Sequence, residues 1–500
     1  MYENRRNSSE NRGFDSIRTK SFKSVISDNT NDNIIYEKDE YLVTTGKENE
    51  EAISYCGISS DSVLGCVLNV ITSTLGGGCL AFPYILHQLG FYISFVIFIL
   101  VTVSIYFSND LLRSFVVDTK YFSFALMTNE ILGKRWLKVY AISSFIYYSV
   151  IEINYLTLMH NTFRGIIIDN NTYNTTDNTT YNTTYNTTDN TTDNTTANKI
   201  FSPIYLVITM IIEILICSFI FNPKKIHILS LVTIVCFIII VLATIIVAFK
   251  NLITKKTLDY LSYQKFFFAQ GLSTSEIILH IFSFIIEYLY GYSYNSSLPT
   301  LLGNMKNIDE DNSKKIHIYS FTGIFFSYIA ISFFGYLICE ENDQQTGKNN
   351  EKYLFATMKK FASRHEFIYY FCKILLWLYL FTVIPMRFIV VRDNYTSLVK
   401  DKMTPKKDLF VTITCIFIYN LVVYFTLDNT GDNSLTTLFI ELFGGIFGVI
   451  ICFCLPVINY VAVNGKKKLK SIIGYILIGF YGIVGLISAV YSFFKSSAGK

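Results

Sequence analysis

Eleven long apolar stretches run through this sequence, and few folds can accommodate them. Each approaches or exceeds the roughly 20 residues that a helix needs to cross a bilayer. Because backbone N–H and C=O groups find no water inside a bilayer, such stretches cross it as helices. The predicted helices cover residues 60–87, 91–112, 138–163, 201–221, 227–249, 273–301, 316–338, 367–391, 408–426, 435–461 and 471–494. We therefore predict an all-α integral membrane protein with eleven transmembrane helices.

The composition agrees with a bilayer as the main partner of the chain. Hydrophobic residues make up 51% of the 500 residues and charged residues only 16%, whereas a soluble domain carries about 25% charged residues. The net charge of +4 gives no sign of a nucleic-acid partner. The ten cysteines show no metal-ligand spacing. We expect neither a metal site nor a disulfide framework.

Polar segments divide the chain into parts. Residues 1–57 hold too little apolar surface to form a core, so they are predicted to be a disordered tail. Residues 58–494 form the predicted eleven-helix domain, and 495–500 form a short C-terminal tail. The loop 166–199 lies between the third and fourth helices and repeats Asn-Thr-Thr every four residues. It is either an expanded surface repeat or a glycosylated one, because each unit is also an N-glycosylation acceptor.

The positions of Lys and Arg predict the orientation in the membrane. Placing the N-terminus on the cytoplasmic side puts 27 of these residues on that face and 13 on the other, as the positive-inside rule requires. The loop 250–265 is an exception. We expect the N-terminus to be cytoplasmic and the C-terminus non-cytoplasmic. No address signal distinguishes the plasma membrane from an acidic digestive or lysosome-like vacuole.

Two predicted helices, the first and the sixth, carry residues that interrupt a helix. Three successive glycines in the first cost about 1 kcal/mol each relative to Ala, so the backbone there is expected to open. In the sixth, small and aromatic polar residues precede Pro299. The two interrupted segments are Thr72, Ser73, Thr74, Leu75, Gly76, Gly77 and Gly78, and Tyr290, Gly291, Tyr292, Ser293, Tyr294 and Asn295.

The two interruptions lie five helices apart, which is the spacing of a five-plus-five inverted repeat. In such folds the broken helices meet near the bilayer midplane, and open backbone is tolerated where it lines a cavity. Free amides there suit a carboxylate, and open carbonyls suit an ammonium or a cation. A zwitterionic amino acid satisfies both. Close packing of small residues is the alternative explanation of the glycines.

Five motifs occur in a fixed order along the chain. They are Gly76 to Tyr84 followed by Gly90, Glu130 to Gly133, Phe334 to Leu337, Ile384 to Arg387, and Gly445 to Gly448 with Leu455 and Pro456. In content and order they resemble the amino acid/auxin permease family of the amino acid-polyamine-organocation superfamily. The resemblance spans about residues 60–490. The Asn-rich insertion is similar to those of malaria parasite proteins.

The resemblance implies a LeuT-like inverted-repeat fold and secondary active transport of amino acids by alternating access. We expect a ten-helix core around the site, with the eleventh helix peripheral to it. The backbone of Leu75 to Gly78 would then hold the substrate carboxylate, and the segment Tyr290 to Asn295 would face the amine and the side chain. The tyrosines at 290, 292 and 294 suggest neutral substrates, with aromatic amino acids among the candidates. Tyr294 and Asn295 stand where many relatives have His-Pro. The resemblance therefore does not decide which amino acid is the substrate.

Two departures from the family concern the coupling ion. Many sodium-coupled members have Asn and Thr where this chain has Thr72 and Leu378. A sodium site weakens when it loses oxygen ligands, so we expect proton coupling or uncoupled exchange, and no cofactor. The family's usual disulfide joins the loops after helices three and seven. Residues 166–200 contain no Cys, so we predict that this bridge is absent.

Ionisable residues inside the predicted helices are candidates for function, because they are costly in a membrane. For Glu276, His280, Lys373 and Arg387, near helix ends, snorkelling or loop pairing is the expected explanation. The remaining ones are Glu152, His160, Glu213, Glu287 and Glu441.

Glu287 and Glu152 are predicted proton-relay residues, because a carboxyl group away from water favours its protonated form. A structural hydrogen bond is the alternative for each of them. Tyr147, Tyr148 and Thr382 are further candidates for the cavity, although aromatic packing explains the two tyrosines equally well.

Other classes of function fit the sequence less well. The six histidines show no HExxH spacing and no GxSxG motif occurs, so we do not expect an enzyme. An amino-acid sensor built on the same fold, or a carrier of other small organic cations, remains an alternative. The sequence does not indicate the oligomeric state. We expect Gly77→Val to abolish transport by filling the space that a substrate needs.

Overall fold

The computed structural model describes most of the helical domain. The described residues are 54–55, 58–59, 62–176, 207–215, 226–255, 274–292, 294–303, 305, 308–338, 367–368, 370–385, 387–388, 390–391, 405–430 and 440–498. The predicted tail up to residue 53, the Asn-Thr-Thr repeat beyond residue 176 and Ser293 lie outside them.

Each of the eleven predicted segments contains helix in the part of the chain that the structure describes. Two very short strands, β1 (Ser54–Tyr55) and β2 (Ile58–Ser59), pair antiparallel before the first helix. The helices are α2 (Val63–Thr74), η1 (Gly77–Ala81), α3 (Phe82–Leu89), α4 (Phe91–Thr119), α5 (Phe124–Leu132), α6 (Lys134–Thr176), 207–215, α8 (Ile226–Lys255), α10 (Thr274–Gly291), α11 (Leu298–Gly303), α12 (Glu310–Ile338), Tyr370–Pro385, α14 (Pro405–Thr430), η5 (Ile440–Gly448), η6 (Ile450–Cys454), α16 (Leu455–Asn464) and α17 (Leu469–Ala498).

Local sequence signals explain where several helices begin and end. Ser62 caps α2, since its hydroxyl oxygen accepts a hydrogen bond from the Gly65 amide at 3.0 Å. Gly90, with φ of 80°, allows the tight turn between α3 and α4. Gly465, with φ of 85°, ends α16 in the same way. These caps leave little chain between consecutive membrane helices.

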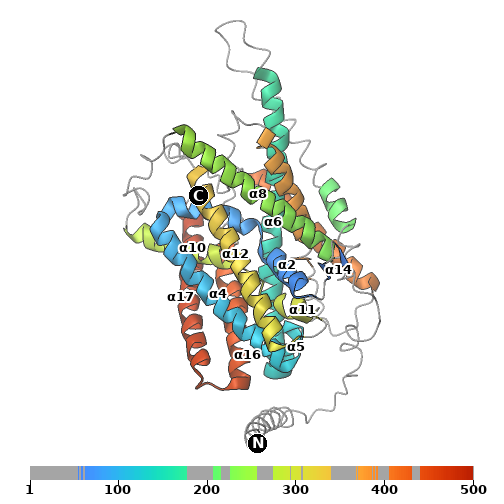
Figure 1. Cartoon of the computed structure of the whole chain (residues 1–500), viewed down its shortest axis with the longest axis vertical. Helices are drawn as coiled ribbons and strands as arrows, with labels where there is room; N and C mark the ends of the chain where they lie inside the picture. Colours follow the sequence, from blue (N-terminus) through green and yellow to red (C-terminus); the bar gives the residue numbers. More distant parts are fainter. Residues whose placement is uncertain are drawn as a thin grey trace, which may run out of the picture.

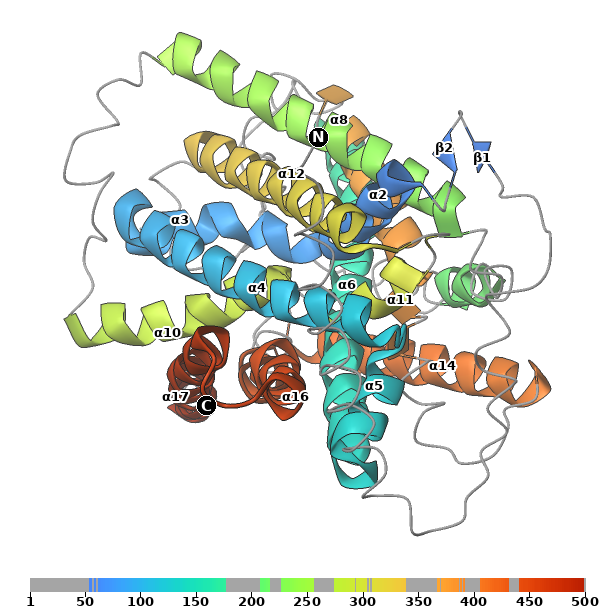
Figure 2. The ribbon, with the colours of Figure 1, turned by 60° about the horizontal axis from the view of Figure 1, so that its bottom comes forward.

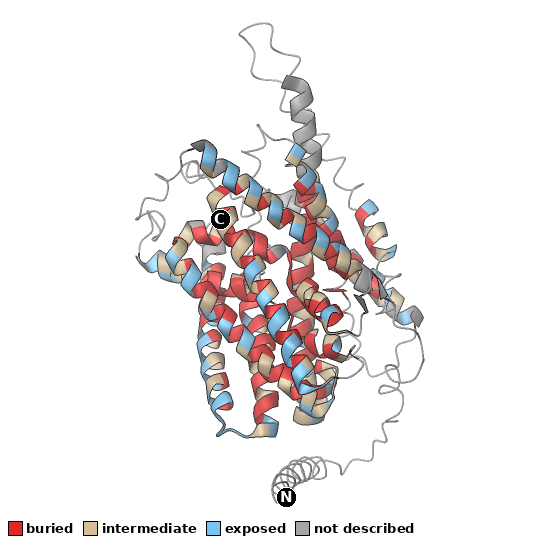
Figure 3. Ribbon diagram, in the orientation of Figure 1, coloured by how far each residue is buried: buried red, intermediate tan, exposed pale blue. Residues whose placement is uncertain are grey.

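Apolar side chains on the outer faces of the helices fit contact with lipid. Five helices in the described residues are long and apolar enough to cross a bilayer, and the bent pair α2 and α3 makes a sixth. On α8, Leu242, Ile246 and Phe249 follow one face and are 52%, 59% and 51% exposed. Figure 3 shows exposed residues along the outside of α8 and α17, and buried ones in the middle of the bundle. The protein is therefore a multi-pass membrane protein.

The helices pack around a core that is rich in aromatic rings. Helix α12 packs against α2, α3 and α8, while α6 packs against α5, α14 and η5 (Figure 1). Figure 2 shows α6 running across the direction of α4 and α12. At the centre, the Phe82 ring lies 5.2 Å from that of Tyr328 and 4.7 Å from that of Tyr288. These contacts join the first, sixth and seventh predicted helices.

Helix α17, which we expected to be peripheral, packs closely against η5 and α10. A Cβ atom added at Gly445 of η5 would lie 2.9 Å from the Gly485 carbonyl oxygen of α17. The Glu441 carboxylate of η5 accepts hydrogen bonds from Ser283 of α10, at 2.6 Å, and from Ser492 of α17. The sequence expectation overlooked this close approach, which the glycines make possible.

Candidate functional site

The first predicted break is present in the structure. Helix α2 ends at Thr74, the 3₁₀-helical turn η1 begins at Gly77, and the axis bends by 53° between the two halves. The Thr74 carbonyl oxygen accepts hydrogen bonds from the Tyr328 hydroxyl, at 3.1 Å, and from Arg387 Nη2, at 3.2 Å. The Thr74 carbonyl has no hydrogen-bond donor within α2 because the helix ends there. Side chains from two other helices donate to it instead.

The second predicted break lies between Gly291, the last residue of α10, and Leu298, the first residue of α11. The Gly291 carbonyl oxygen accepts a hydrogen bond from the Tyr328 hydroxyl at 2.6 Å. Within the break, Asn295 Nδ2 donates to the Cys452 carbonyl oxygen of η6 at 3.4 Å. The same carbonyl accepts a hydrogen bond from Ser108 of α4.

The two breaks lie against each other, as the predicted inverted repeat requires. A Cβ atom added at Gly78 would lie 3.1 Å from Tyr290 Cδ1 and 3.5 Å from the Gly291 Cα atom. One added at Gly291 would lie 2.7 Å from Phe82 Cζ. The absence of side chains at both positions is what permits this approach.

Arg387 lies at the first break, which corrects our expectation of a snorkelling residue near a helix end. Its side chain is 3% exposed, and its guanidinium carbon lies 4.9 Å from the centre of the Tyr155 ring, a cation–π distance. Its Nη2 atom would lie 3.1 Å from a Cβ added at Gly76. Sequence position alone could not show that the eighth predicted helix passes beside the first break.

Glu152 is the more deeply buried of the two proton-relay candidates. It lies on α6 with 1% exposure, and neither carboxyl oxygen accepts a hydrogen bond from the described residues. The positive charge of Arg387 attracts an ionised Glu152, and the negative charge of an ionised Glu213 repels it. Glu287, by contrast, is half-buried, and its charge acts on the neighbouring Tyr288.

The tyrosines of the second break anchor it to other helices. The Tyr290 hydroxyl accepts a hydrogen bond from Asn154 Nδ2 at 3.1 Å and donates to the Ile151 carbonyl oxygen of α6 at 3.3 Å. The Tyr292 hydroxyl lies 2.9 Å from that of Thr102 on α4. Tyr294 is fully buried, and Ser293 lies outside the described residues.

The hydroxyl groups just before the first break bond to backbone. Thr72 donates to the Leu68 carbonyl at 2.8 Å and approaches the Ser230 carbonyl of α8 at 3.4 Å. Ser73 and Thr74 donate to the Val70 carbonyl at 2.9 and 2.7 Å. Such bonds to the preceding turn are common for these residues in helices and weaken the helix locally.

The remaining candidates divide between the site and the surrounding packing. Tyr148, one turn before Glu152 on α6, interacts electrostatically with Arg387. Tyr147 packs instead on η5, where its Cε2 atom would lie 2.9 Å from a Cβ added at Gly448. Thr382 accepts a hydrogen bond from the Thr233 hydroxyl of α8 at 2.8 Å and donates to the Tyr379 carbonyl.

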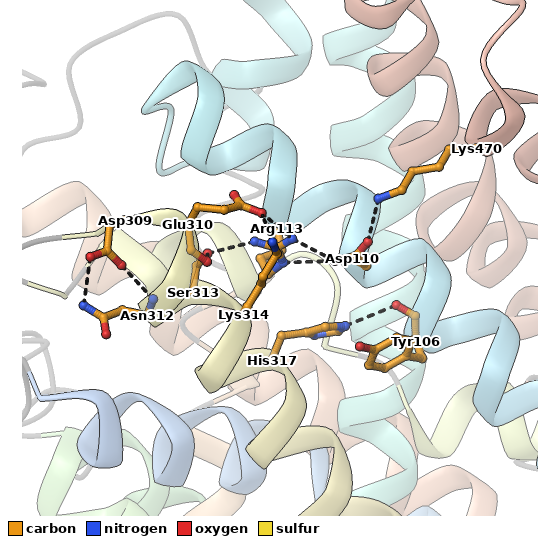
Figure 4. A network of polar contacts seen from close by, with 10 residues as sticks. All are labelled: Tyr106, Asp110, Arg113, Asp309, Glu310, Asn312, Ser313, Lys314, His317 and Lys470. Atoms are coloured by element: carbon orange, nitrogen blue, oxygen red, sulfur yellow. Dashed lines mark hydrogen bonds and ion pairs between the residues drawn. The ribbon is translucent and has the colours of Figure 1, made fainter. Parts of the chain in front are cut away.

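A second polar cluster, which sequence analysis missed, joins α4, α12 and α17. Arg113 of α4 is 2% exposed, and its Nη2 atom lies 2.9 Å from Asp110 and 3.1 Å from Glu310 of α12. Lys470 of α17 reaches the other oxygen of Asp110 at 2.9 Å. Figure 4 shows Arg113 between the two carboxylates, with its Nη1 atom on the Ser313 hydroxyl. Among the described residues no three His, Cys, Asp or Glu side chains form a metal-binding group.

Comparison with known proteins gives a family and many similar solved structures, two of which are described here. A family model described as transmembrane amino acid transporter protein matches residues 59–497. MhsT in complex with L-phenylalanine is similar with a TM-score of 0.51 and 16% identity, over 87% of this chain and 98% of that chain. A substrate-bound, outward-open Na⁺-coupled sialic acid symporter has a TM-score of 0.49 and 12% identity, over 86% of this chain and 88% of that chain. No curated protein matches the chain significantly.

The likeness to MhsT confirms the predicted inverted-repeat fold. The family model covers nearly all of the predicted eleven-helix domain and confirms the resemblance drawn from the five motifs. The family is one of transmembrane amino acid transporters, so the function is transport of amino acids and the protein is not an enzyme. The chain belongs to the transmembrane amino acid transporter family.

Proposed function

We propose that the protein carries neutral amino acids by alternating access, with the substrate held between the two breaks. The contact between the breaks, with the buried guanidinium of Arg387 on one of them, is the observation that carries this proposal. Broken helices that meet inside a bundle are where transporters of this architecture bind their substrates. The segments Leu75 to Gly78 and Tyr290 to Asn295 would supply the backbone groups.

The charges around the breaks favour substrates with a carboxylate and a neutral side chain. A guanidinium group binds carboxylates through two parallel hydrogen bonds, and it repels organic cations. The surroundings are apolar and aromatic, with Phe82, Tyr288 and Tyr328 in ring contact, so a charged substrate side chain would lie against aromatic rings there, which is costly. MhsT, which shares this fold, was observed with L-phenylalanine.

We propose protons, or no ion at all, as the coupling species rather than sodium. Thr72 directs its hydroxyl group to the carbonyls of Leu68 and Ser230. Leu378, at the other position where sodium-coupled relatives carry an oxygen ligand, is 36% exposed and offers none. A hard cation needs several oxygen ligands at once. Glu152 and Glu287 are the proposed proton carriers.

We propose further that the N-terminus is cytoplasmic and the C-terminus non-cytoplasmic, in the plasma membrane or in an acidic vacuolar membrane. The distribution of Lys and Arg supports this orientation. A cysteine introduced near either end of the chain and labelled with an impermeant thiol reagent in intact cells would test it. Labelling of the N-terminal cysteine in intact cells would reverse the assignment.

Uptake of labelled amino acids into liposomes that contain the purified protein tests the function directly. Neutral, aromatic and cationic amino acids are compared under a proton gradient, under a sodium gradient and without a gradient. We expect saturable uptake of neutral amino acids that a proton gradient stimulates or leaves unchanged. Stimulation by sodium would contradict the proposed coupling. Binding without uptake of any amino acid would favour the sensor.

A further inference from the structure

We propose that the turn between α16 and α17, residues 465–470, binds the headgroup of an anionic phospholipid, with the acyl chains along the first turns of α17. Both flanking helices are long and apolar enough to cross a bilayer, so the turn lies at a membrane surface, among lipid headgroups. Such a site goes beyond the proposed carriage of amino acids and does not depend on which of them is the substrate. The turn carries four exposed lysines: Lys466, Lys467, Lys468 and Lys470.

Hydrogen bonds fix the backbone of this turn. Gly465 ends α16 with φ of 85°, and its carbonyl oxygen accepts a hydrogen bond from the Ser471 hydroxyl at 2.8 Å. The amide groups of Ser471 and Ile472 donate to the Lys468 carbonyl oxygen at 2.9 and 3.2 Å. In Figure 1 the turn joins α16 and α17 at the lower end of the bundle. The lysines are therefore held close together on a short, ordered segment.

Two of the four ammonium groups have partners within the protein. Lys468 Nζ donates to Asn464 Oδ1 at 2.8 Å. Lys470 Nζ lies 2.9 Å from Asp110 Oδ2 of α4. Lys466 and Lys467 are exposed, and neither forms an ion pair with a described residue. These two ammonium groups can therefore bind a group outside the protein.

The protein supplies little negative charge to balance the turn. No Asp or Glu follows Glu441 in the sequence. Among the described residues, Asp110 is the acid that pairs with the turn, and it already pairs with the buried Arg113 at 2.9 Å. Positive charge therefore remains at the membrane surface, where it attracts the phosphate groups of anionic lipids. In the proposed orientation this is the cytoplasmic surface, whose leaflet is rich in such lipids.

Apolar side chains of α17 continue directly from the lysines. Leu469, Ile472 and Ile476 are exposed, and their spacing places them on one face of the helix. Tyr475 is also exposed, and tyrosines are typical of the level of the headgroups. A phospholipid has the same order of chemistry, a charged headgroup followed by apolar chains. Free phosphate would match the lysines alone, so the surface favours a lipid.

A basic loop can also serve only to orient the chain in the membrane. That role needs positive charge on this face of the bundle, whereas lipid binding needs it at this turn. Lys314 and Lys315, at the start of α12, are exposed on the same face. The ion pairs of Figure 4 show this, because they connect Glu310 of α12 to Lys470 of the turn. The two pairs of lysines therefore distinguish the two explanations.

The direct test measures which lipids stay bound to the purified full-length protein. Native mass spectrometry in detergent compares phosphatidylglycerol with phosphatidylcholine of identical acyl chains. We expect phosphatidylglycerol to bind more tightly, by about fivefold for each of the two free lysines, and the preference to decrease at high salt. Phosphatidylglycerol should also raise the temperature of thermal unfolding. Equal retention of the two lipids by the wild-type protein would overturn the proposal.

Variants assign the preference to the turn. The double variant Lys466→Gln with Lys467→Gln should lose the preference, and Lys466→Arg with Lys467→Arg should keep it, because Arg also binds phosphate. Lys314→Gln with Lys315→Gln is the matched control, since it removes the same charge from the same face, and it should bind lipid as the wild type does. Equal losses in the two Gln variants would mean that no site exists at the turn.

Inorganic phosphate tests the other source of the same chemistry. A large excess of it should not displace phosphatidylglycerol beyond the effect of chloride at equal ionic strength, because phosphate makes no contact with Leu469, Ile472 and Ile476. Specific displacement would overturn the lipid site in favour of a phosphate site. Lipid retention is measured without substrate, so failure of amino-acid uptake would reject the proposed function and leave the lipid site standing.

Discussion

Gly76, at the first break, lies where there is no room for a side chain. A Cβ atom added there would collide with the hydroxyl group of Tyr155 and lie 3.1 Å from Arg387 Nη2. Tyr155 cannot move freely, because its ring stacks under the guanidinium group at 4.9 Å. The glycine therefore sets the position of the charge that we assign to substrate recognition.

We expect Gly76→Ala to abolish amino-acid binding and to cost about 1–3 kcal/mol of stability, as overpacking of a tight site does. Thermal unfolding in detergent and substrate binding are the measurements. Gly479→Ala on α17 is the control, since a Cβ atom there meets nothing within 4 Å. A Gly76→Ala protein that binds normally would move the site away from this break.

Arg113 permits a second test with a neighbouring control. It is buried, and it bonds to Asp110, Glu310 and Ser313. Arg113→Met should destabilise the protein by about 2 kcal/mol, the worth of a hydrogen bond to a charged group, and leave two carboxylates close together. Lys314→Ala removes another partner of Glu310, but that pair is exposed, so a change of less than about 1 kcal/mol is expected. Equal effects in the two unfolding curves would contradict this account.

At the scale of elements, Tyr328 of α12 connects both broken helices. Its hydroxyl group donates to Thr74 of the first break and to Gly291 of the second. The two carbonyls belong to half-helices that the fold brings together from distant parts of the chain. Tyr328 of the seventh predicted helix is therefore hydrogen-bonded to both broken helices.

Tyr328→Phe should keep the ring packing and remove the hydrogen bonds. We expect a loss of about 1–3 kcal/mol, because the buried Gly291 carbonyl loses a donor, together with a lower turnover rate in liposomes. Tyr319→Phe on the same helix, where the side chain is 58% exposed, should behave as wild type. Unchanged stability and turnover in Tyr328→Phe would mean that the hydroxyl group is dispensable.

The two helix breaks could be predicted from the sequence, whereas contacts between distant helices could not. Runs of glycine and small polar residues predicted both breaks, because such residues disfavour a continuous helix regardless of their surroundings. Arg387 was misplaced, since its distance from a helix end does not reveal which helix passes beside it. Arg113 and Glu310 pair across 197 residues, and no local pattern links them.

At the scale of the whole molecule, α17 is part of the packed bundle. The backbones of Gly445 and Gly485 meet, and Glu441 accepts hydrogen bonds from both α10 and α17. Helix η5 is thereby held between the sixth and the eleventh predicted helices. The eleventh helix was expected to be peripheral because hydropathy identifies a membrane helix but not its neighbours.

Gly445→Val should force α17 away from η5 and lower the yield of folded protein, because its Cβ would meet backbone rather than a movable side chain. Gel filtration in detergent and thermal unfolding measure the effect. Gly482→Val, at a position with open space around it, is the control. A folded Gly445→Val protein of wild-type stability would show that α17 adjusts without cost.

A hydroxyl group has one proton, whereas two carbonyl oxygens lie within reach of Tyr328. In this conformation the bond to Gly291, at 2.6 Å, is shorter than the one to Thr74, at 3.1 Å. Strengthening either bond draws the proton away from the other. The Tyr328 hydroxyl therefore cannot give a full hydrogen bond to both breaks at once: a conformation that shortens its bond to one carbonyl weakens its bond to the other, and Arg387 then remains as the donor to Thr74.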